Sequence, residues 1–273
     1  MAVAAAPRYQ RARRRRALQN AVYAFAGIGG ALAIWQFLVW WKDVPVFVVP
    51  APTVIFARMF EIWPTLLNDL MWTMLPAALG LAVGLSVGTI SGILMAQWRF
   101  LERSLFPIAV LIRLTPFVAL VPLLIVWLSP GLKPKVVIAA LITFFPFVVN
   151  SISGLRSADL NTVDLVTTLG GSKWETFRHV RWPSAKPYLF PALKLAVNLS
   201  LIGAIVAEYY GARRGIGVRI FLADQILDME TMFAAIFVLA AVGVSLTMAT
   251  LALERWTLHW HESVRSTDTQ TIT

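Results

Sequence analysis

Long apolar stretches, separated by shorter polar segments, form the main pattern along this 273-residue chain. A helix that crosses the hydrocarbon core of a bilayer needs about 20 predominantly apolar residues. Six stretches come close to or exceed this length, so the pattern predicts an all-α, polytopic membrane protein with about six transmembrane helices. The predicted membrane domain is 21–258, with spans at 21–41, 73–97, 106–128, 136–152, 189–207 and 231–251.

The composition also indicates a membrane protein. Hydrophobic residues make up 58% of the chain and charged residues only 14%, whereas charged residues make up about 25% of a typical soluble domain. These proportions exclude an ordinary soluble enzyme and a disordered chain. The chain contains no cysteine, which excludes disulfide scaffolds, thiolate metal sites and cysteine nucleophiles.

The distribution of charge predicts the orientation of the spans. The net charge is +10, and six arginines lie within the first sixteen residues, ahead of the first apolar stretch. We expect residues 1–20 to form a flexible basic tail in the cytoplasm, and residues 259–273 to form a second cytoplasmic tail. This orientation places fifteen Lys and Arg residues inside and seven outside, in agreement with the positive-inside rule. So much membrane-spanning sequence disfavours nucleic acid as a partner and favours membrane lipid.

The second predicted span carries a regular glycine pattern. Gly80, Gly84, Gly88 and Gly92 recur every four residues and therefore share one stripe of the helix. Small residues let helix backbones approach closely in lipid. The stripe predicts a tight helix contact, either within the chain or between two copies. A surface that slides during gating is the alternative.

A few charged residues fall within or at the ends of the predicted spans. Arg113 lies near the middle of the third span, followed by Pro116, and Glu208 lies at the outer end of the fifth. Charges at membrane depth usually face a cavity or a partner, and prolines loosen helices there. These three residues are candidates for a translocation pathway, while a structural ion pair is the other interpretation of Arg113. Lys194 is expected to extend its ammonium group towards the cytoplasmic face.

Two motifs suggest chemistry that their surroundings do not support. Residues 84–88 match the G-x-S-x-G pattern of serine hydrolases, with Ser86 as nucleophile, but this chemistry needs a strand-to-helix elbow and a histidine base. All three histidines fall in predicted cytoplasmic segments. Residues 170–173 read G-G-S-K and lack the full spacing of a phosphate-binding loop, so ATP, if used, must be bound by another subunit.

The segment 153–188 is the longest polar and basic connection between the predicted spans. Asp159 predicts the start of a short helix, and Gly170 with Gly171 predicts its end and a turn. Ser172 then predicts the N-cap of a second short helix.

The second short helix is predicted to carry two aromatic residues on one face and to stop at Pro183. Trp174 and Phe177 are three positions apart, with Lys173 and Arg178 beside them. This combination suits a knob that docks into a partner. A helix that lies among lipid headgroups, anchored by its tryptophan, is the alternative.

Residues 164–183 resemble the EAA loop of binding-protein-dependent ABC importer permeases. That motif reads E-A-A, three residues, Gly, nine residues, Ile, any residue and Leu-Pro. The spacing is kept in full, with Asp164, Leu165 and Val166 at E-A-A, Gly170 at the glycine, Val180 at the isoleucine, Trp182 at the leucine and Pro183 at the proline. The departures are aspartate for glutamate and Leu-Val for the two alanines, and they keep an acidic residue in place.

Further elements resemble the branch of this family that carries nitrate, sulfonate and taurine. They are V-P-A-P-T at 49–53, RLTPFVALVPLLIVW at 113–127, and A-E at 207–208 followed by G-I-G at 215–217. The runs PLLIVW, ALITFFPFVVN and ALKLAVNLSLIGAIVAEYYGA resemble most the permeases for vitamin precursors such as pyrimidines, thiamine precursors or riboflavin. The resemblance thus implies a vitamin precursor as solute, with nitrate, taurine, sulfonate or an aromatic acid as the alternative.

This resemblance implies a type I ABC importer permease fold with a cytoplasmic coupling helix, in the inner membrane of a bacterium or archaeon. It also implies a homodimer of permeases, a cytoplasmic ATPase dimer that binds ATP and Mg and docks on the loop, and an external solute-binding protein. The coupling residues implied are Asp164, Gly170, Gly171, Lys173, Trp174, Phe177, Arg178 and Pro183. The chain itself then carries no cofactor, metal site or catalytic residue. More distant alternatives are an intramembrane serine hydrolase that uses Ser86 and a stand-alone transporter.

Overall fold

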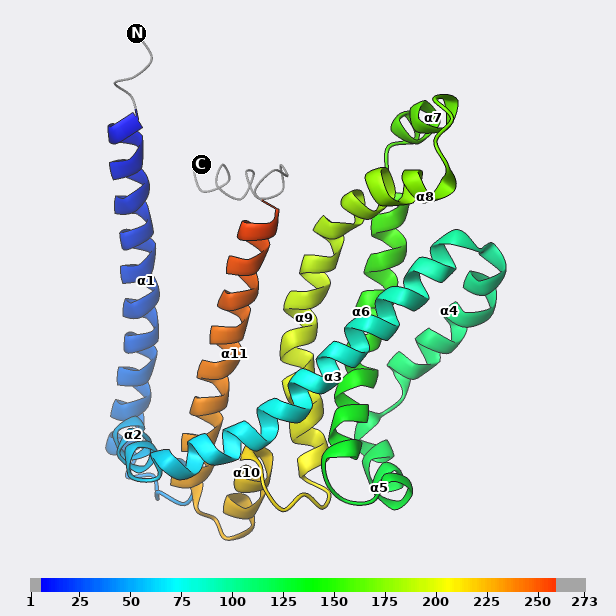
Figure 1. Ribbon diagram of the computed structural model, residues 1–273. Coiled ribbons are helices and arrows are strands. Elements are labelled where there is room, and N and C mark those ends of the chain that lie inside the picture. Colours follow the sequence, from blue (N-terminus) through cyan, green and yellow to red (C-terminus); the bar gives the residue numbers. More distant parts are fainter. Residues whose placement is uncertain (1–5, 259–273) are drawn as a thin grey trace. The chain divides into compact units, whose positions relative to one another are not determined.

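The computed structural model describes residues 6–258, and in this part of the chain helices are joined by short connections without any strand (Figure 1). The predicted all-α fold is confirmed, and the predicted tail 259–273 lies outside the described residues. The elements are α1 (Ala6–Trp41), α2 (Pro52–Glu61), α3 (Trp63–Gln97), α4 (Arg99–Leu114), α5 (Phe117–Leu128), α6 (Leu132–Arg156), α7 (Leu160–Thr168), α8 (Lys173–Thr176), a π-helical segment (Phe177–Arg181), α9 (Trp182–Glu208), α10 (Ile216–Gln225) and α11 (Met229–Thr257).

Four helical segments of the described chain are long and apolar enough to cross a membrane. They are α3, α6, the continuous segment Lys173–Glu208 and α11. The predicted span 106–128 is not one helix, because α4 and α5 are bent by 98° against each other. If this bent pair counts as one span, the described residues contain five.

The bend between α4 and α5 comes from Thr115 and Pro116. Their ψ angles are 131° and 95°, so both residues leave the helical conformation. A proline ring disfavours the helical conformation in the residue before it, and the proline itself has no N–H to continue the helix. The Thr115 hydroxyl instead donates to the Leu111 carbonyl at 2.8 Å and closes the end of α4.

Residues 1–20 were predicted to form a flexible tail, but α1 begins at Ala6 and runs without interruption into the first apolar stretch. The prediction of flexibility is therefore wrong for residues 6–20. Alanine, arginine and glutamine dominate this part of the sequence, and all three have high helix propensity. The apolar part of α1, Phe25–Trp41, is shorter than the four spanning segments.

The chain divides into two compact units: residues 1–63 with 223–234, and residues 64–222 with 235–273. In the first unit, the Gln36 side chain of α1 accepts hydrogen bonds from the N–H and hydroxyl groups of Thr53, both at 3.2 Å. The Arg58 side chain of α2 donates to the Thr231 hydroxyl at 3.0 Å. These polar contacts hold α2 to α1 and to the start of α11.

In the second unit, α6 and α9 lie side by side and form its centre (Figure 1). They approach so closely that a β-carbon added at Gly203 would lie 2.8 Å from the Ala139 Cα, and one added at Gly154 would lie 2.9 Å from the Ala185 Cα. Small residues on both helices therefore allow contact between backbones, as is usual for helices packed in lipid.

The glycine stripe of α3 lies against α6 in the same chain. A β-carbon added at Gly80, Gly84, Gly88 or Gly92 would lie 2.9, 2.8, 2.5 or 2.8 Å, respectively, from a main-chain oxygen of α6. No side chain fits in this gap unless the two helices separate. The stripe thus forms a helix contact within the chain, and its use as a sliding surface stays a prediction.

Polar contacts also join α9 to α11 within the second unit. Lys194 pairs with Glu254 at 2.5 Å, and the Asn198 amide donates to the Thr247 hydroxyl at 3.0 Å. Both members of the ion pair are partly buried. Lys194 therefore binds a neighbouring helix, whereas the sequence predicted a side chain extended towards the membrane surface.

Candidate functional site

The predicted coupling loop forms an elbow, residues 159–183, at the end of α6 and α9 that is remote from α5 (Figure 1). Its first helix, α7, starts where predicted. The Asp159 carboxylate accepts hydrogen bonds from the Thr162 hydroxyl at 2.7 Å and from the N–H groups of Thr162 and Asn161, each at 3.2 Å. These hydrogen bonds lower the pKa of Asp159 below its usual value, and the bond from the Thr162 hydroxyl has the largest effect.

The turn between α7 and α8 depends on two glycines. Gly170 has a φ of +82°, which residues with a side chain rarely adopt. The Gly171 N–H donates to the Val166 carbonyl at 2.9 Å, and a β-carbon at Gly171 would lie 2.5 Å from the Val166 Cγ1. The pair ends α7 and reverses the chain, as the sequence predicted.

Ser172 caps α8 with a reciprocal pair of hydrogen bonds. The Glu175 N–H donates to the Ser172 hydroxyl at 3.2 Å, and the Ser172 N–H donates to the Glu175 carboxylate at 2.7 Å. This capping box satisfies two N–H groups that would otherwise lack partners. The predicted cap at Ser172 is confirmed.

The predicted stop at Pro183 is wrong. The four residues of α8 continue through the π-helical segment into α9, so that Lys173–Glu208 is one helical path. The π-helical turn lets the Trp182 N–H reach the Phe177 carbonyl, five residues back, immediately before the proline. Pro183 is the second residue of α9, so the wider turn lies directly before the proline, which has no N–H to donate.

Aromatic and aliphatic side chains cover the outer surface of the elbow. Trp174 and Phe177 stack with ring centroids 5.6 Å apart and an interplanar angle of 22°, so the predicted pair lies together. Trp174 is 65% exposed, and Leu160, Leu165 and Leu169 of the α7 region are at least 59% exposed. The elbow thus presents apolar side chains to its surroundings.

The remaining predicted coupling residues have different environments. Asp164, Lys173 and Arg178 are exposed, whereas Pro183 is half-buried. Phe177 is half-buried and lines a cavity of about 210 Å³ between the elbow and the ends of α3 and α6. Phe177 therefore packs against Trp174 and is less accessible than Trp174.

A salt bridge that the sequence did not predict holds α6 to α4 near the elbow. The two guanidinium nitrogens of Arg156 donate to the two carboxylate oxygens of Glu102 at 2.8 and 2.6 Å. Their positions, 54 residues apart, give no local signal of this pairing. Arg156 is one of the fifteen Lys and Arg residues that the predicted orientation places inside.

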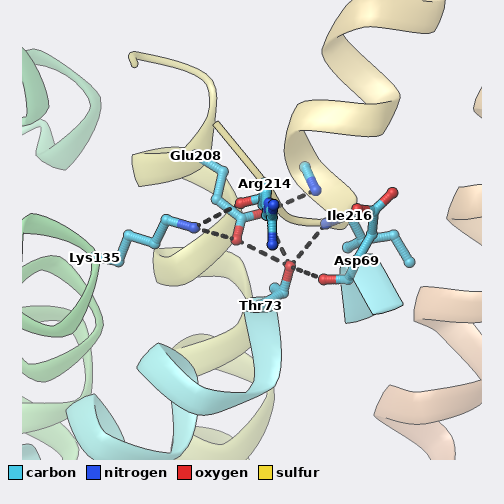
Figure 2. A network of polar contacts seen from close by, with 7 residues as sticks. Asp69, Thr73, Lys135, Glu208, Arg214 and Ile216 are labelled. Carbon is cyan, nitrogen blue, oxygen red and sulfur yellow. Dashed lines mark hydrogen bonds and ion pairs between the residues drawn. The ribbon is translucent and has the colours of Figure 1, made fainter. Parts of the chain in front are cut away.

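A second group of polar residues gathers at the opposite end of α6 and α9 (Figure 2). The Lys135 ammonium group donates to the Glu208 carboxylate at 2.8 Å and to the Arg214 carbonyl at 2.9 Å. The Thr73 hydroxyl lies 2.9 and 3.0 Å from the two oxygens of Glu208 and accepts from the Ile216 N–H at 2.8 Å. These contacts join α3, α6, α9 and the α9–α10 connection.

The turn around Gly215 and Gly217 encloses the Glu208 carboxylate. The Gly217 N–H donates to this carboxylate at 2.8 Å. A β-carbon at Gly215 would overlap the carboxylate, and one at Gly217 would lie 2.8 Å from a carboxylate oxygen. The A-E and G-I-G elements of the sequence are thus two halves of one buried site.

Burial separates this ion pair from the other salt bridges of the described chain. Glu208 is 1% exposed and Lys135 is 6% exposed. The sequence predicted Glu208 for a translocation pathway, and Lys135 is one of the seven Lys and Arg residues that the predicted orientation places outside. Both side chains are enclosed here, and membership of a pathway stays a prediction for Glu208. No local pattern in the sequence indicates the pairing of Lys135 with a residue 73 positions away.

Arg113 and Pro116 lie on exposed parts of the α4–α5 bend. The Arg113 guanidinium carbon lies 4.8 Å from the centroid of the Phe145 ring, a cation–π contact. With the described residues Arg113 forms no ion pair, so the structure does not support the ion-pair interpretation. A role in a solute pathway stays a prediction for Arg113 and Pro116.

The G-x-S-x-G pattern does not form a hydrolase site. Residues 84–88 lie inside α3, and the required strand-to-helix elbow is not formed there. Ser86 is exposed on the helix, on a different face from the glycine stripe.

Comparison with known proteins agrees with this architecture. The profile described as "Binding-protein-dependent transport system inner membrane component" matches residues 84–259. The riboflavin transport system permease protein RibX of Chloroflexus aurantiacus is 32% identical over 237 residues, which cover 85% of this chain and 87% of the relative.

Other relatives have similar identity and different named solutes. The formylaminopyrimidine transport permease protein ThiX of Halalkalibacterium halodurans is 31% identical over 236 residues, covering 85% of this chain and 92% of the relative. A putative aliphatic sulfonates transport permease protein, SsuC of Bacillus subtilis, is 30% identical over 234 residues, covering 85% of each chain.

The fold also matches a solved structure whose sequence identity to this chain is low. A chain of the MetNI methionine ABC transporter, crystallised in an inward-facing conformation, superposes with a TM-score of 0.65 at 17% identity. The match covers 71% of this chain and 97% of that chain. The predicted type I permease fold and the predicted family are thereby confirmed. This chain belongs to the family of binding-protein-dependent transport system inner membrane components, the permease subunits of ABC importers.

Proposed function

We propose that the elbow is the docking site of a cytoplasmic ATPase, and that this permease uses the docked ATPase to drive solute uptake. The observation that carries the proposal is the exposure of Trp174, which projects from the first turn of a helix that continues into a membrane span. Exposed apolar patches on folded proteins commonly mark protein–protein contacts. Buried tryptophans dominate the binding energy of many such contacts.

The structure of the elbow suits a segment that moves as a rigid body. The capping box at Ser172 and the glycine turn fix the start of α8, and the stack of Trp174 on Phe177 fixes its aromatic surface. Exposed cations, Lys173 and Arg178, border this surface and can attract an acidic groove.

The connection of the elbow to the membrane helices supports transmission of this movement. Because Lys173–Glu208 is one helical path, a displacement of Trp174 is carried into α9. The close contact of α9 with α6, at Gly154 and Gly203, leaves little room for either helix to move alone. A movement of the elbow is therefore expected to shift both helices together.

In this proposal the elbow and both chain termini face the cytoplasm, as the excess of Lys and Arg on that side favours. Two identical permeases form the pathway, one ATPase docks on each elbow, and an external binding protein delivers the solute. The family description, which names binding-protein-dependent transport, supports the last of these partners.

Trp174→Asp tests the docking role. With purified permease, ATPase and binding protein in liposomes, we expect ATPase activity stimulated by the loaded binding protein to fall by about tenfold or more, as for the loss of an interface hot spot. The permease itself is expected to remain folded, because Trp174 is 65% exposed.

Trp98→Asp is a matched control for this experiment. Trp98 is 52% exposed and lies between α3 and α4, outside the elbow. Equal stimulation in the wild type and in Trp174→Asp would refute docking at this surface. Solute uptake into liposomes by the permease alone would instead identify a stand-alone transporter.

We further propose that the solute is a small vitamin precursor of the pyrimidine, thiamine-precursor or riboflavin type. The similarity to RibX and ThiX supports this class. The test is a gentle detergent pull-down from native membranes, followed by a ligand screen of the binding protein that is recovered. A binding protein selective for taurine, nitrate or an aliphatic sulfonate would favour the alternative and overturn this assignment.

A further inference from the structure

A pocket of about 490 Å³ opens beside the buried ion pair of Lys135 and Glu208. Its walls come from Trp72 and Leu75 of α3, from the α5–α6 connection and from the α9–α10 connection. Pockets of about 300–1,000 Å³ with mostly apolar walls and a few polar groups are the usual form of small-molecule sites. Neither the family description nor the named relatives assign a role to this pocket.

Two arginines on the α9–α10 connection give the pocket a positive wall. Arg213 and Arg214 are exposed, and neither forms an ion pair with the residues that the structure describes. The nearby acids already have partners, because Glu208 binds Lys135 and Asp69 binds Arg219 at 2.7 Å. The two guanidinium groups thus offer hydrogen-bond donors without a local counter-charge.

An aromatic ring lies against one of these two guanidinium groups. The Arg214 guanidinium carbon lies 5.4 Å from the centroid of the Trp72 ring. Arginine combines planar stacking with a fork of N–H donors, and an indole offers a broad stacking surface. Together they can hold a flat ligand and bind acceptor atoms at its edge.

The apolar share of the walls favours a ring over a bare anion. Besides the cations, the pocket is lined by Trp72, Leu75, a proline, a leucine, an alanine and glycines. A small anion would bind the arginines but leave these walls in contact with water. A ring covers them and gains the corresponding hydrophobic free energy.

We propose that this pocket binds a small planar aromatic ring with hydrogen-bond acceptors. The ring takes the place of the Arg214 guanidinium over Trp72, and Arg213 and Arg214 donate to its acceptors. This proposal rests on the proposed function, because the pocket faces outward in the orientation given there. The aromatic ring is then the class of solute that the permease meets on its outer side. Lys135 donates to the Arg214 carbonyl, which places the pocket one hydrogen bond away from the Glu208 network (Figure 2). A ligand that holds Arg214 therefore also holds the turn that encloses Glu208.

The test uses the full-length permease in lipid nanodiscs, without ATPase or binding protein. Riboflavin is the first probe and formylaminopyrimidine is the second. Calorimetry measures the binding of both, because quenching of flavin fluorescence by the indole would be lost in Trp72→Leu whether or not the ligand binds. We expect saturable binding of at least one probe, weakened tenfold or more in both Trp72→Leu and Arg214→Gln. Trp98→Leu, which changes an exposed tryptophan outside the pocket, is expected to bind as the wild type does.

Three results would overturn the proposal. They are the absence of saturable binding of both probes to the folded wild type, unchanged binding in Trp72→Leu, or displacement of the probe by taurine, an anion without a ring. Thermal unfolding of each variant verifies that it is folded. Because no ATPase is present, failure here leaves the Trp174 experiment unaffected, and failure of coupling leaves this binding measurable.

Discussion

Lys135→Met is expected to lower the free energy of unfolding by about 3–5 kcal/mol, the usual effect of removing one partner of a buried ion pair. Lys135 and Glu208 are 6% and 1% exposed, and their contact at 2.8 Å supplies the only counter-charge to Glu208 among the described residues. Without it, the carboxylate remains enclosed with only the Thr73 hydroxyl and the Gly217 N–H as donors. Thermal unfolding in nanodiscs and the yield of folded protein measure the effect.

Two further variants make this result specific. Lys133→Met changes the same residue type two positions earlier, where the side chain is exposed, and is expected to have little effect on unfolding. The double variant Lys135→Met with Glu208→Gln is expected to recover most of the lost stability, because a neutral amide can still accept from Gly217. If Lys135→Met and Lys133→Met unfold alike, the ion pair does not stabilise this end of the bundle.

Gly84→Ala is expected to destabilise the protein by about 1–3 kcal/mol, through overpacking of the contact between α3 and α6. The added methyl group would overlap the Thr143 hydroxyl and lie 2.8 Å from the Ala140 carbonyl oxygen. Both neighbours belong to α6, and one is main chain, so the helices must separate to make room. Thermal unfolding and the rate of proteolysis of folded protein are the measurements.

Gly30→Ala is the same substitution at a position where the opposite effect on protein stability is expected. A β-carbon at Gly30 of α1 would meet nothing within 4 Å. Alanine is favoured over glycine inside a helix by about 0.5–1 kcal/mol, so this variant is expected to be neutral or slightly stabilising. Equal loss of stability in both variants would mean that the glycine stripe is not a tight contact.

Together these variants separate two properties of the permease. The Lys135 and Gly84 substitutions act on the stability of the membrane helices, whereas Trp174→Asp acts on an exposed surface and is expected to spare stability. A variant with normal unfolding and lost ATPase stimulation therefore identifies coupling, and the reverse combination identifies packing.

Local sequence features determined much of this protein. Runs of apolar residues predicted six spans, of which the described residues contain four, or five with the bent pair α4–α5. Asp159 and Ser172 predicted two helix starts, and Gly170 predicted the turn between them. These features depend on contacts only a few residues apart, such as the capping box between Ser172 and Glu175. The spacing of the elbow residues also predicted the family, which the comparisons confirm.

The two prolines Pro116 and Pro183 show that a proline does not by itself determine the path of a helix. Pro116 and Pro183 carry the same constraints, yet the chain bends by 98° at the first and continues as a helix through the second. The difference lies in the neighbouring backbone, because Thr115 adopts an extended conformation while the π-helical segment before Pro183 widens the turn. A proline alone therefore predicts a perturbation of a helix but not its form.

Local sequence predicted most of the long helices, the caps at Asp159 and Ser172, the glycine stripe and the turn at Gly170, because each depends on residues within a few turns of one another. Which helices share a contact and which charges meet depends on tertiary packing. Lys135 and Glu208 are 73 residues apart, and Thr73 joins Glu208 across 135 residues. Such pairs form because a charge enclosed among packed helices must find a partner. The partner is set by which helix ends come together, and no local pattern in the sequence records it.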